Sequence, residues 1–184
     1  MNKESNVFGE YRINHNPGYD FLRLLTWMDQ IDPQDPRLPF GPYLIETIAV
    51  ISACCALEGY LNMVGKEIDK EWNEFDKGFK PVKDKISHIY QIVGKEIDFG
   101  IGLWQEVLCL FKTRASLVHP RYNNKKEICE EEIPDLFQEV NSKYPTDKTK
   151  QIAEDAIDLL LLDTGLTRLR NLYLIRAYSG PPRL

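Results

Sequence analysis

The stretch PYLIETIAVISACCALEGYLNMVGK (residues 42–66) decides the fold, because no other part of the chain is as apolar. Its larger apolar residues fall into two stripes at helical spacing: Leu44, Ile48, Ile51 and Cys55, and Val50, Cys54, Leu57 and Leu61. A helix that is apolar on most sides is surrounded by other helices. The stretch therefore predicts the central helix of a bundle, ending near Gly65, since glycine is a common helix cap.

Apolar residues recur at helical spacing along most of the remaining chain. They predict helices over 19–30, 82–93, 101–118, 134–144 and 145–178, with a polar amphipathic stretch over 70–79. The last of these helices is expected to kink at Asp163-Thr-Gly165. No segment alternates apolar and polar residues as a strand does. We therefore predict an all-α fold, a helical bundle with a four-helix core plus additional short helices.

The length of 184 residues suits one domain with its own core, so residues 1–184 are predicted to form a single helical domain. Residues 1–17 are polar and irregular, which predicts a flexible N-terminal segment. Residues 31–42 carry four prolines and predict a Pro-rich linker, because proline interrupts helices. The core is then expected over about 42–178.

Composition and charge exclude several classes of protein. The net charge of −5 argues against a surface coated with positive charge for non-specific binding of nucleic acid. Four cysteines are present without C-x-x-C spacing, so we expect no zinc site, redox motif or other cofactor. The N-terminus lacks the apolar region of a signal peptide, and no uncharged run reaches about 20 residues. We expect a cytoplasmic protein with no membrane partner.

One pair of residues stands out for its chemistry, Arg114 and His119 in the segment RASLVHPR (residues 114–121). Histidine transfers protons near neutral pH, and arginine binds phosphate oxygens and stabilises negative charge that develops on them. The pair suits chemistry on a phosphodiester. Residues five apart diverge on an ideal helix, but Pro120 releases His119 from helical geometry. Alternatively, two copies pool their residues across a dimer axis.

Glu58 and Asn62 extend the stripe that begins at Leu44, three and seven residues beyond Cys55. This register predicts a carboxylate and an amide on the core-facing side of the central helix. A buried carboxylate needs a partner, so we expect Glu58 to meet and orient Arg114. The alternative is that the C-terminal part of this helix reaches solvent.

The segment ALEGYLN (residues 56–62) in an early core helix, followed by R-x4-H near the end of a later helix, resembles the HEPN superfamily of helical proteins. The resemblance covers about residues 40–178. It implies a metal-independent endoribonuclease, of the kind found among toxins and defence proteins, that works as a homodimer with the R-x4-H residues facing each other. It also implies that Arg114 holds the scissile phosphate, while His119 transfers protons as the ribose 2′-hydroxyl attacks that phosphate.

Two functional classes stay open, and a third possibility is a helical protein in which Arg114 is structural. Active members of the family often carry a polar residue directly after the arginine, where this chain has Ala115. Other members lack activity and serve as binding or dimerisation modules. The first class is an RNA-cleaving hydrolase, with an antitoxin or another protein as its partner. The alternative is a catalytically inactive helical dimer that binds a nucleotide or a protein.

A short basic stretch follows the histidine. We interpret Arg121, Tyr122, Lys125 and Lys126 as an RNA-facing patch in which Tyr122 stacks on a base. The alternative is a solvated surface loop. An acidic chain with such a segment is expected to grip phosphate at one place and to bind long nucleic acid weakly.

Overall fold

The structure is a computed structural model that describes residues 17–32, 41–118, 140 and 142–170. Its helices are α1 (Pro17–Met28), α2 (Gly41–Ile68), α3 (Trp72–Phe75), α4 (Val82–Ile92), α5 (Gly102–Val118) and α7 (Thr146–Asp163). No strand occurs within the described ranges. The prediction of an all-α helical bundle is confirmed.

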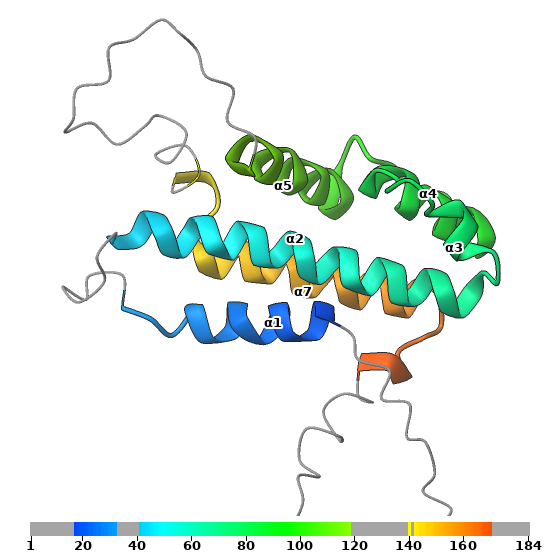
Figure 1. Cartoon of the computed structure of the whole chain (residues 1–184), viewed down its shortest axis with the longest axis horizontal. Helices are drawn as coiled ribbons and strands as arrows, with labels where there is room; N and C mark the ends of the chain where they lie inside the picture. The colour runs from blue at the N-terminus through cyan, green and yellow to red at the C-terminus, as the bar shows by residue number, and fades with distance from the viewer. Residues whose placement is uncertain (1–16, 33–40, 119–139, 141, 171–184) are drawn as a thin grey trace, which may run out of the picture.

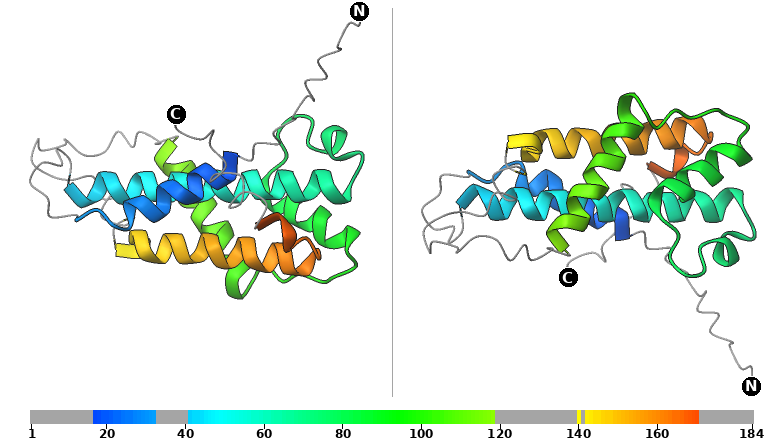
Figure 2. Two further views of the ribbon diagram at one scale, coloured as in Figure 1. Left: turned by 90° about the horizontal axis from the view of Figure 1, so that it is seen from below. Right: turned by 90° about the horizontal axis from the view of Figure 1, so that it is seen from above.

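The central helix is α2, as predicted, and it contacts α1, α3, α4, α5 and α7. The neighbouring α1 runs antiparallel to α2, while α7 packs beside both and runs in the same direction as α2 (Figure 1). On the side of α2 away from α1, α5 crosses α2 and α7 steeply (Figure 2). Four long helices, α1, α2, α5 and α7, thus enclose the core, and α3 and α4 pack at the end where α2 finishes.

The two predicted stripes of α2 are buried to different extents. The second stripe is buried throughout, with Val50, Cys54, Leu57 and Leu61 at most 1% exposed. On the first stripe, Leu44 is 41% exposed and Ile48 is 37% exposed, so the expectation that this stripe faces the core is wrong for its N-terminal half. The alanines Ala49 and Ala53 are fully buried instead. Their small side chains let neighbouring helices pack close to α2.

Gly65 lies inside α2 and does not cap it, so this part of the prediction is wrong. The helix continues to Ile68. A Cβ atom at Gly65 would stand 2.2 Å from ring carbons of Trp72, which is 1% exposed. The glycine therefore provides the space in which the indole lies against α2, and its role is close approach rather than a turn.

Two other elements are shorter than predicted. The amphipathic stretch 70–79 contains only α3, a single turn, because the chain turns again at Gly78, where φ is +93°. The last long helix, α7, ends at Asp163, and Gly165 follows with φ of +70°. The predicted kink is thus an interruption, and another helical turn begins at Arg168.

The core begins earlier than about residue 42, the boundary that we expected. Leu25 and Met28 of α1 are buried in the same cluster as the apolar side chains of α2. Most of the predicted linker and of the flexible N-terminal segment lies outside the described residues. The same holds for most of the helix predicted over 134–144 and for the last helix beyond residue 170.

By length and composition alone, the part of α2 from Tyr43 to Ile68 is apolar enough to cross a membrane. In the structure, 56% of its most apolar window is buried inside the protein. Such burial is expected of the central helix of a bundle, whose apolar side chains face other helices.

Candidate functional site

Arg114 lies one turn before the end of α5 at Val118, on the same side of the helix as the fully buried Leu110. The residue is half-buried. Its Nε atom is buried and meets no hydrogen-bond acceptor in the part of the chain that the structure describes. A buried N–H without an acceptor is rare and costs roughly 1–3 kcal/mol. Arg114 is therefore a candidate for binding a ligand.

The positive charge of Arg114 acts on two adjacent cysteines of α2, the helix that α5 crosses (Figure 2). Burial raises the pKa of the Cys54 and Cys55 thiols, Arg114 lowers it, and the carboxylate of Glu58 raises it again. Because burial has the largest effect, both thiols stay protonated near neutral pH. They are packing residues beside the arginine rather than nucleophiles.

Glu58 and Asn62 contact a lysine of α4 and not Arg114. Lys85 Nζ lies 3.5 Å from Glu58 Oε1 and donates a 2.9 Å hydrogen bond to Asn62 Oδ1. Within the described ranges, no ion pair joins Glu58 to Arg114. The expected pairing is therefore not formed. Glu58 lies at the half-buried edge of α2, where α4 supplies a closer cation.

Lys85 is 1% exposed, and it is not among the site residues predicted above. Its ammonium also lies 2.9 Å from Asp76 Oδ1, within ion-pair distance but outside the geometry of a hydrogen bond. Two carboxylates and an amide thus surround one buried cation, as a charge removed from water requires. The sequence held a signal, because Lys85 precedes the buried Ile89 by four residues and shares its side of α4.

A second polar contact lies at the same end of the molecule, where α2 finishes. His88 Nε2 lies 2.8 Å from Asp69 Oδ2, and the ring stacks on Phe75 with the centroids 3.9 Å apart. The hydrogen bond with His88 lowers the pKa of Asp69. Asp69 stands about 20 Å along α2 from Cys55, which lies near Arg114. We interpret these contacts as structural, because they fasten the turn between α2 and α3 to α4.

The other half of the predicted pair, His119, lies outside the described residues. The same is true of the predicted RNA-binding residues, Arg121, Tyr122, Lys125 and Lys126. The described part of α5 ends at Val118, directly before His119. That Arg114 and His119 act together stays a prediction.

Several exposed apolar side chains lie on α5 and α2. Ala115 is exposed, and Val118, one turn beyond Arg114, is 44% exposed. Leu44 and Ile48 lie on the same stripe of α2 as Cys55 and are also exposed. Among the described residues, no three His, Cys, Asp or Glu side chains are grouped to hold a metal ion.

Comparisons of the chain with protein-family models, curated proteins and solved structures found no match. A functional proposal therefore depends on the residues themselves and on the resemblance of their motifs.

Proposed function

We propose that this chain is a HEPN-like, metal-independent endoribonuclease of the cytoplasm, with Arg114 and His119 as its catalytic residues. The observation that carries the proposal is the buried Nε of Arg114, which has no acceptor in the described structure and stands one turn before the end of α5. A guanidinium held in this way suits the oxygens of a phosphate. In the sequence, His119 follows five residues later, where Pro120 stops the helix.

In this mechanism, His119 takes the proton of a ribose 2′-hydroxyl while the hydroxyl oxygen attacks the adjacent phosphorus. The bond from phosphorus to the 5′-oxygen of the next nucleotide breaks. That oxygen receives a proton from the His119 of a second copy. The products are a 2′,3′-cyclic phosphate and a 5′-hydroxyl. Arg114 donates hydrogen bonds to the non-bridging oxygens, where negative charge grows in the transition state.

A homodimer is part of the proposal. Leu44 and Ile48 form an exposed apolar stripe on α2, and Val118 adds a third exposed apolar side chain at the end of α5. Covering these side chains with a second copy would remove them from water and bring two copies of the site together. If the chain is a toxin, an antitoxin is the protein partner that would block this site.

The remaining predicted residues have supporting roles in the proposal. Glu58 and Asn62 hold α4 against α2 through Lys85, so they stabilise the fold behind the site and do not contact RNA. The basic residues from Arg121 to Lys126 are proposed to contact the RNA backbone next to the cleaved bond.

The proposal is tested by incubating the purified chain with single-stranded and structured RNA in the presence of EDTA. We expect cleavage that leaves a 2′,3′-cyclic phosphate, and we expect His119→Ala and Arg114→Gln each to slow it by about 10²–10⁴-fold. Arg168→Gln is the matched control, since the side chain of Arg168 is 72% exposed. Equal cleavage by wild type and His119→Ala would reject the assigned site, and loss of cleavage in EDTA would reject metal independence.

The second candidate is a catalytically inactive dimer that binds a nucleotide or a protein. Ala115 favours it, because an exposed methyl group stands next to Arg114 where active HEPN proteins often carry a polar side chain. Binding of RNA or a nucleotide without cleavage by the wild-type chain would support this candidate and reject the first.

A further inference from the structure

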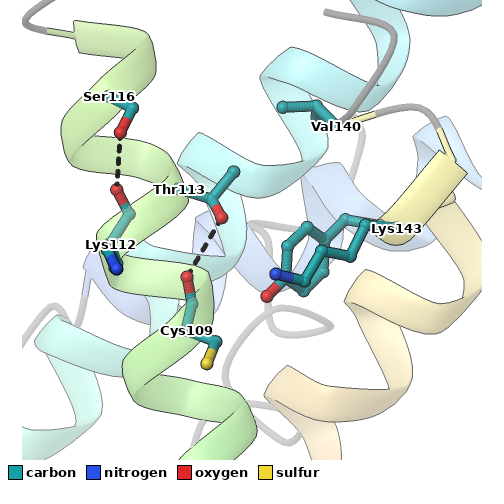
Figure 3. Close-up of a pocket in the computed structure, with 7 residues that line it drawn as sticks. Cys109, Lys112, Thr113, Ser116, Val140 and Lys143 are labelled. Carbon is teal, nitrogen blue, oxygen red and sulfur yellow. Dashed lines mark hydrogen bonds between the residues drawn. The ribbon is translucent and has the colours of Figure 1, made fainter. Parts of the chain in front are cut away.

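A cavity of about 270 Å³ lies beside the last turns of α5, between this helix and the segment from Val140 to Tyr144. Lys112, Thr113 and Ser116 line one wall (Figure 3). The opposite wall carries Lys143, whose side chain reaches toward α5 (Figure 3). The next residue, Tyr144, also lines the cavity. The cavity is smaller than the roughly 300–1,000 Å³ of a typical small-molecule site, so it suits a small group.

The polar lining of this cavity consists of cations and hydroxyl groups. Lys112 and Lys143 contribute two ammonium groups, and Thr113, Ser116 and Tyr144 contribute three hydroxyls. Among the described lining residues there is no carboxylate. Burial raises the pKa of Tyr144, so its hydroxyl stays protonated and is available as a donor. Such a lining favours an oxyanion over a cation or a neutral group.

The wall that carries Lys143 is held firmly. Tyr144 is 3% exposed, its N–H bonds the carbonyl of Val140 at 2.8 Å, and its own carbonyl accepts a 3.1 Å bond from the buried Thr149 hydroxyl. On the other wall, the hydroxyls of Thr113 and Ser116 donate to carbonyls one turn earlier in α5 and line up along the helix. A fixed frame with long, exposed lysines at its rim can adjust to an anion without disturbing the core.

We propose that this cavity binds a phosphate group, supplied by an RNA strand or by a nucleotide. The ammonium groups of Lys112 and Lys143 pair with the anion from opposite walls, and the Tyr144 hydroxyl donates to one of its oxygens. The RNA source rests on the proposed function, whereas phosphate binding by the cavity does not.

The cavity is next to Arg114 but separate from it. Thr113 and Arg114 are consecutive residues, and consecutive side chains on a helix point about 100° apart. Arg114 is directed to α2, whereas Thr113 is directed to the cavity. A strand whose scissile phosphate binds Arg114 therefore passes along α5, where a neighbouring phosphate can enter the cavity.

Binding is measured by titrating the full chain with three probes: inorganic phosphate, adenosine monophosphate, and a 2′-O-methyl RNA oligonucleotide that cannot be cleaved by 2′-hydroxyl attack. The test variant is the double substitution Lys112→Gln with Lys143→Gln. The matched control is Lys66→Gln, an exposed lysine in the last turn of α2. Because both test side chains are exposed, the double variant is expected to fold, which circular dichroism checks.

We expect phosphate to bind the wild type and the control alike, and the double variant to bind it about tenfold or more weakly. Displacement of phosphate by the oligonucleotide identifies an RNA strand as the source, and displacement by adenosine monophosphate alone identifies a nucleotide. The proposal is overturned if wild type and double variant bind all three probes equally, or if the wild type binds none.

The two proposals fail separately. A chain that binds phosphate at the cavity but cleaves no RNA would overturn the nuclease and keep the cavity. A double variant that cleaves RNA with the KM of the wild type, and binds phosphate as the wild type does, would overturn the cavity and keep the nuclease.

Discussion

At Gly65, α2 lacks a side chain where the indole of Trp72 meets it. The consequence is testable with Gly65→Ala, whose Cβ would stand 2.2 Å from the ring. The ring must move, so we expect a loss of about 1–3 kcal/mol in the free energy of unfolding, measured in urea. Gly100→Ala is the control, because the nearest atom there is an oxygen of the Asp98 side chain at 3.1 Å and Gly100 is exposed. Equal stability of both variants would contradict the close packing.

Replacing Lys85 should lower the stability of the fold, because Lys85 is the cation between Glu58 and Asp76. Lys85→Met leaves the carboxylates of Glu58 and Asp76 without their cation. Breaking a fully buried pair costs roughly 3–5 kcal/mol, but these carboxylates keep some contact with water, so we expect a loss of about 2 kcal/mol. Lys83→Met, an exposed lysine of the same helix, is the control for thermal unfolding. A Lys85→Met variant as stable as wild type would show that apolar packing replaces the ion pair.

Glu46 should make stability depend on pH. Burial, and then the negative charge of Asp147, raise the pKa of Glu46 from 4.5 to about 7. The folded state thus holds the proton more tightly than the unfolded chain, and stability is lost as pH rises between these two values. With allowance for solvent screening, we expect Glu46→Gln to stabilise the protein by about 1 kcal/mol at pH 8.

The same substitution should have no effect near pH 3, well below 4.5, where Glu46 is protonated in both states. Urea unfolding at the two pH values measures the difference. Glu106→Gln, an exposed glutamate of α5, is the control. A stabilisation of the same size at both pH values would contradict the raised pKa of Glu46.

Residue pairs that are close in the sequence could be predicted, whereas pairs that become neighbours only in the folded protein could not. The pair Arg114 and His119 is identifiable because its chemistry lies within six residues. The partner of Asn62 is not, because Lys85 stands 23 residues away in the chain and becomes a neighbour only when α4 packs on α2. The cavity proposed to bind phosphate is not identifiable for the same reason, since its two lysines come from separate segments.

Among the elements, helix positions were predictable and helix rotations were not. The predicted bounds of α4 and α5 agree with the structure within one residue. Pro81 precedes the first helix, and Pro120 predicted the end of the second. Which face of α2 is exposed was not predictable. The helix is apolar nearly all round, so its sequence pattern does not single out one buried face.

The junction of α4 with α7 rests on one carboxylate. Asp163 Oδ2 accepts a 2.7 Å bond from the Tyr90 hydroxyl, and Oδ1 lies 2.5 Å from Lys95 Nζ. Burial alone would raise the pKa of Asp163, but the bonds from Lys95 and Tyr90 outweigh it and lower that pKa. The stability supplied by this junction is therefore present at neutral pH and lost as pH falls through the lowered value.

Tyr90→Phe tests this junction. We expect a loss of about 1–2 kcal/mol at pH 7, because a hydrogen bond to a charged acceptor disappears while Lys95 stays in place. The loss should shrink once Asp163 is protonated at low pH. Urea unfolding at several pH values gives the comparison, and a loss that does not change with pH would contradict the role of the carboxylate.

For the whole molecule, the proposed dimer predicts that Ile48→Glu gives a monomer. A charge at this exposed position of α2 would have to be buried at the interface, so association should weaken by at least about a hundredfold, as light scattering measures. RNA cleavage should fall in parallel. Leu162→Glu on α7 is the matched control, since Leu162 is 66% exposed. Equal effects of the two substitutions would remove the assignment of this interface to α2.

The order of the helices along the chain also has a consequence for synthesis. The first two helices, α1 and α2, are made early, but both pack against α7, which is made last among the long helices. A nascent chain therefore keeps the part of α2 that α7 covers exposed until residues near Asp163 have left the ribosome, and such surfaces attract chaperones and proteases. Chains released before that point are expected to be degraded. Truncated forms of the proposed nuclease should therefore not accumulate in the cell.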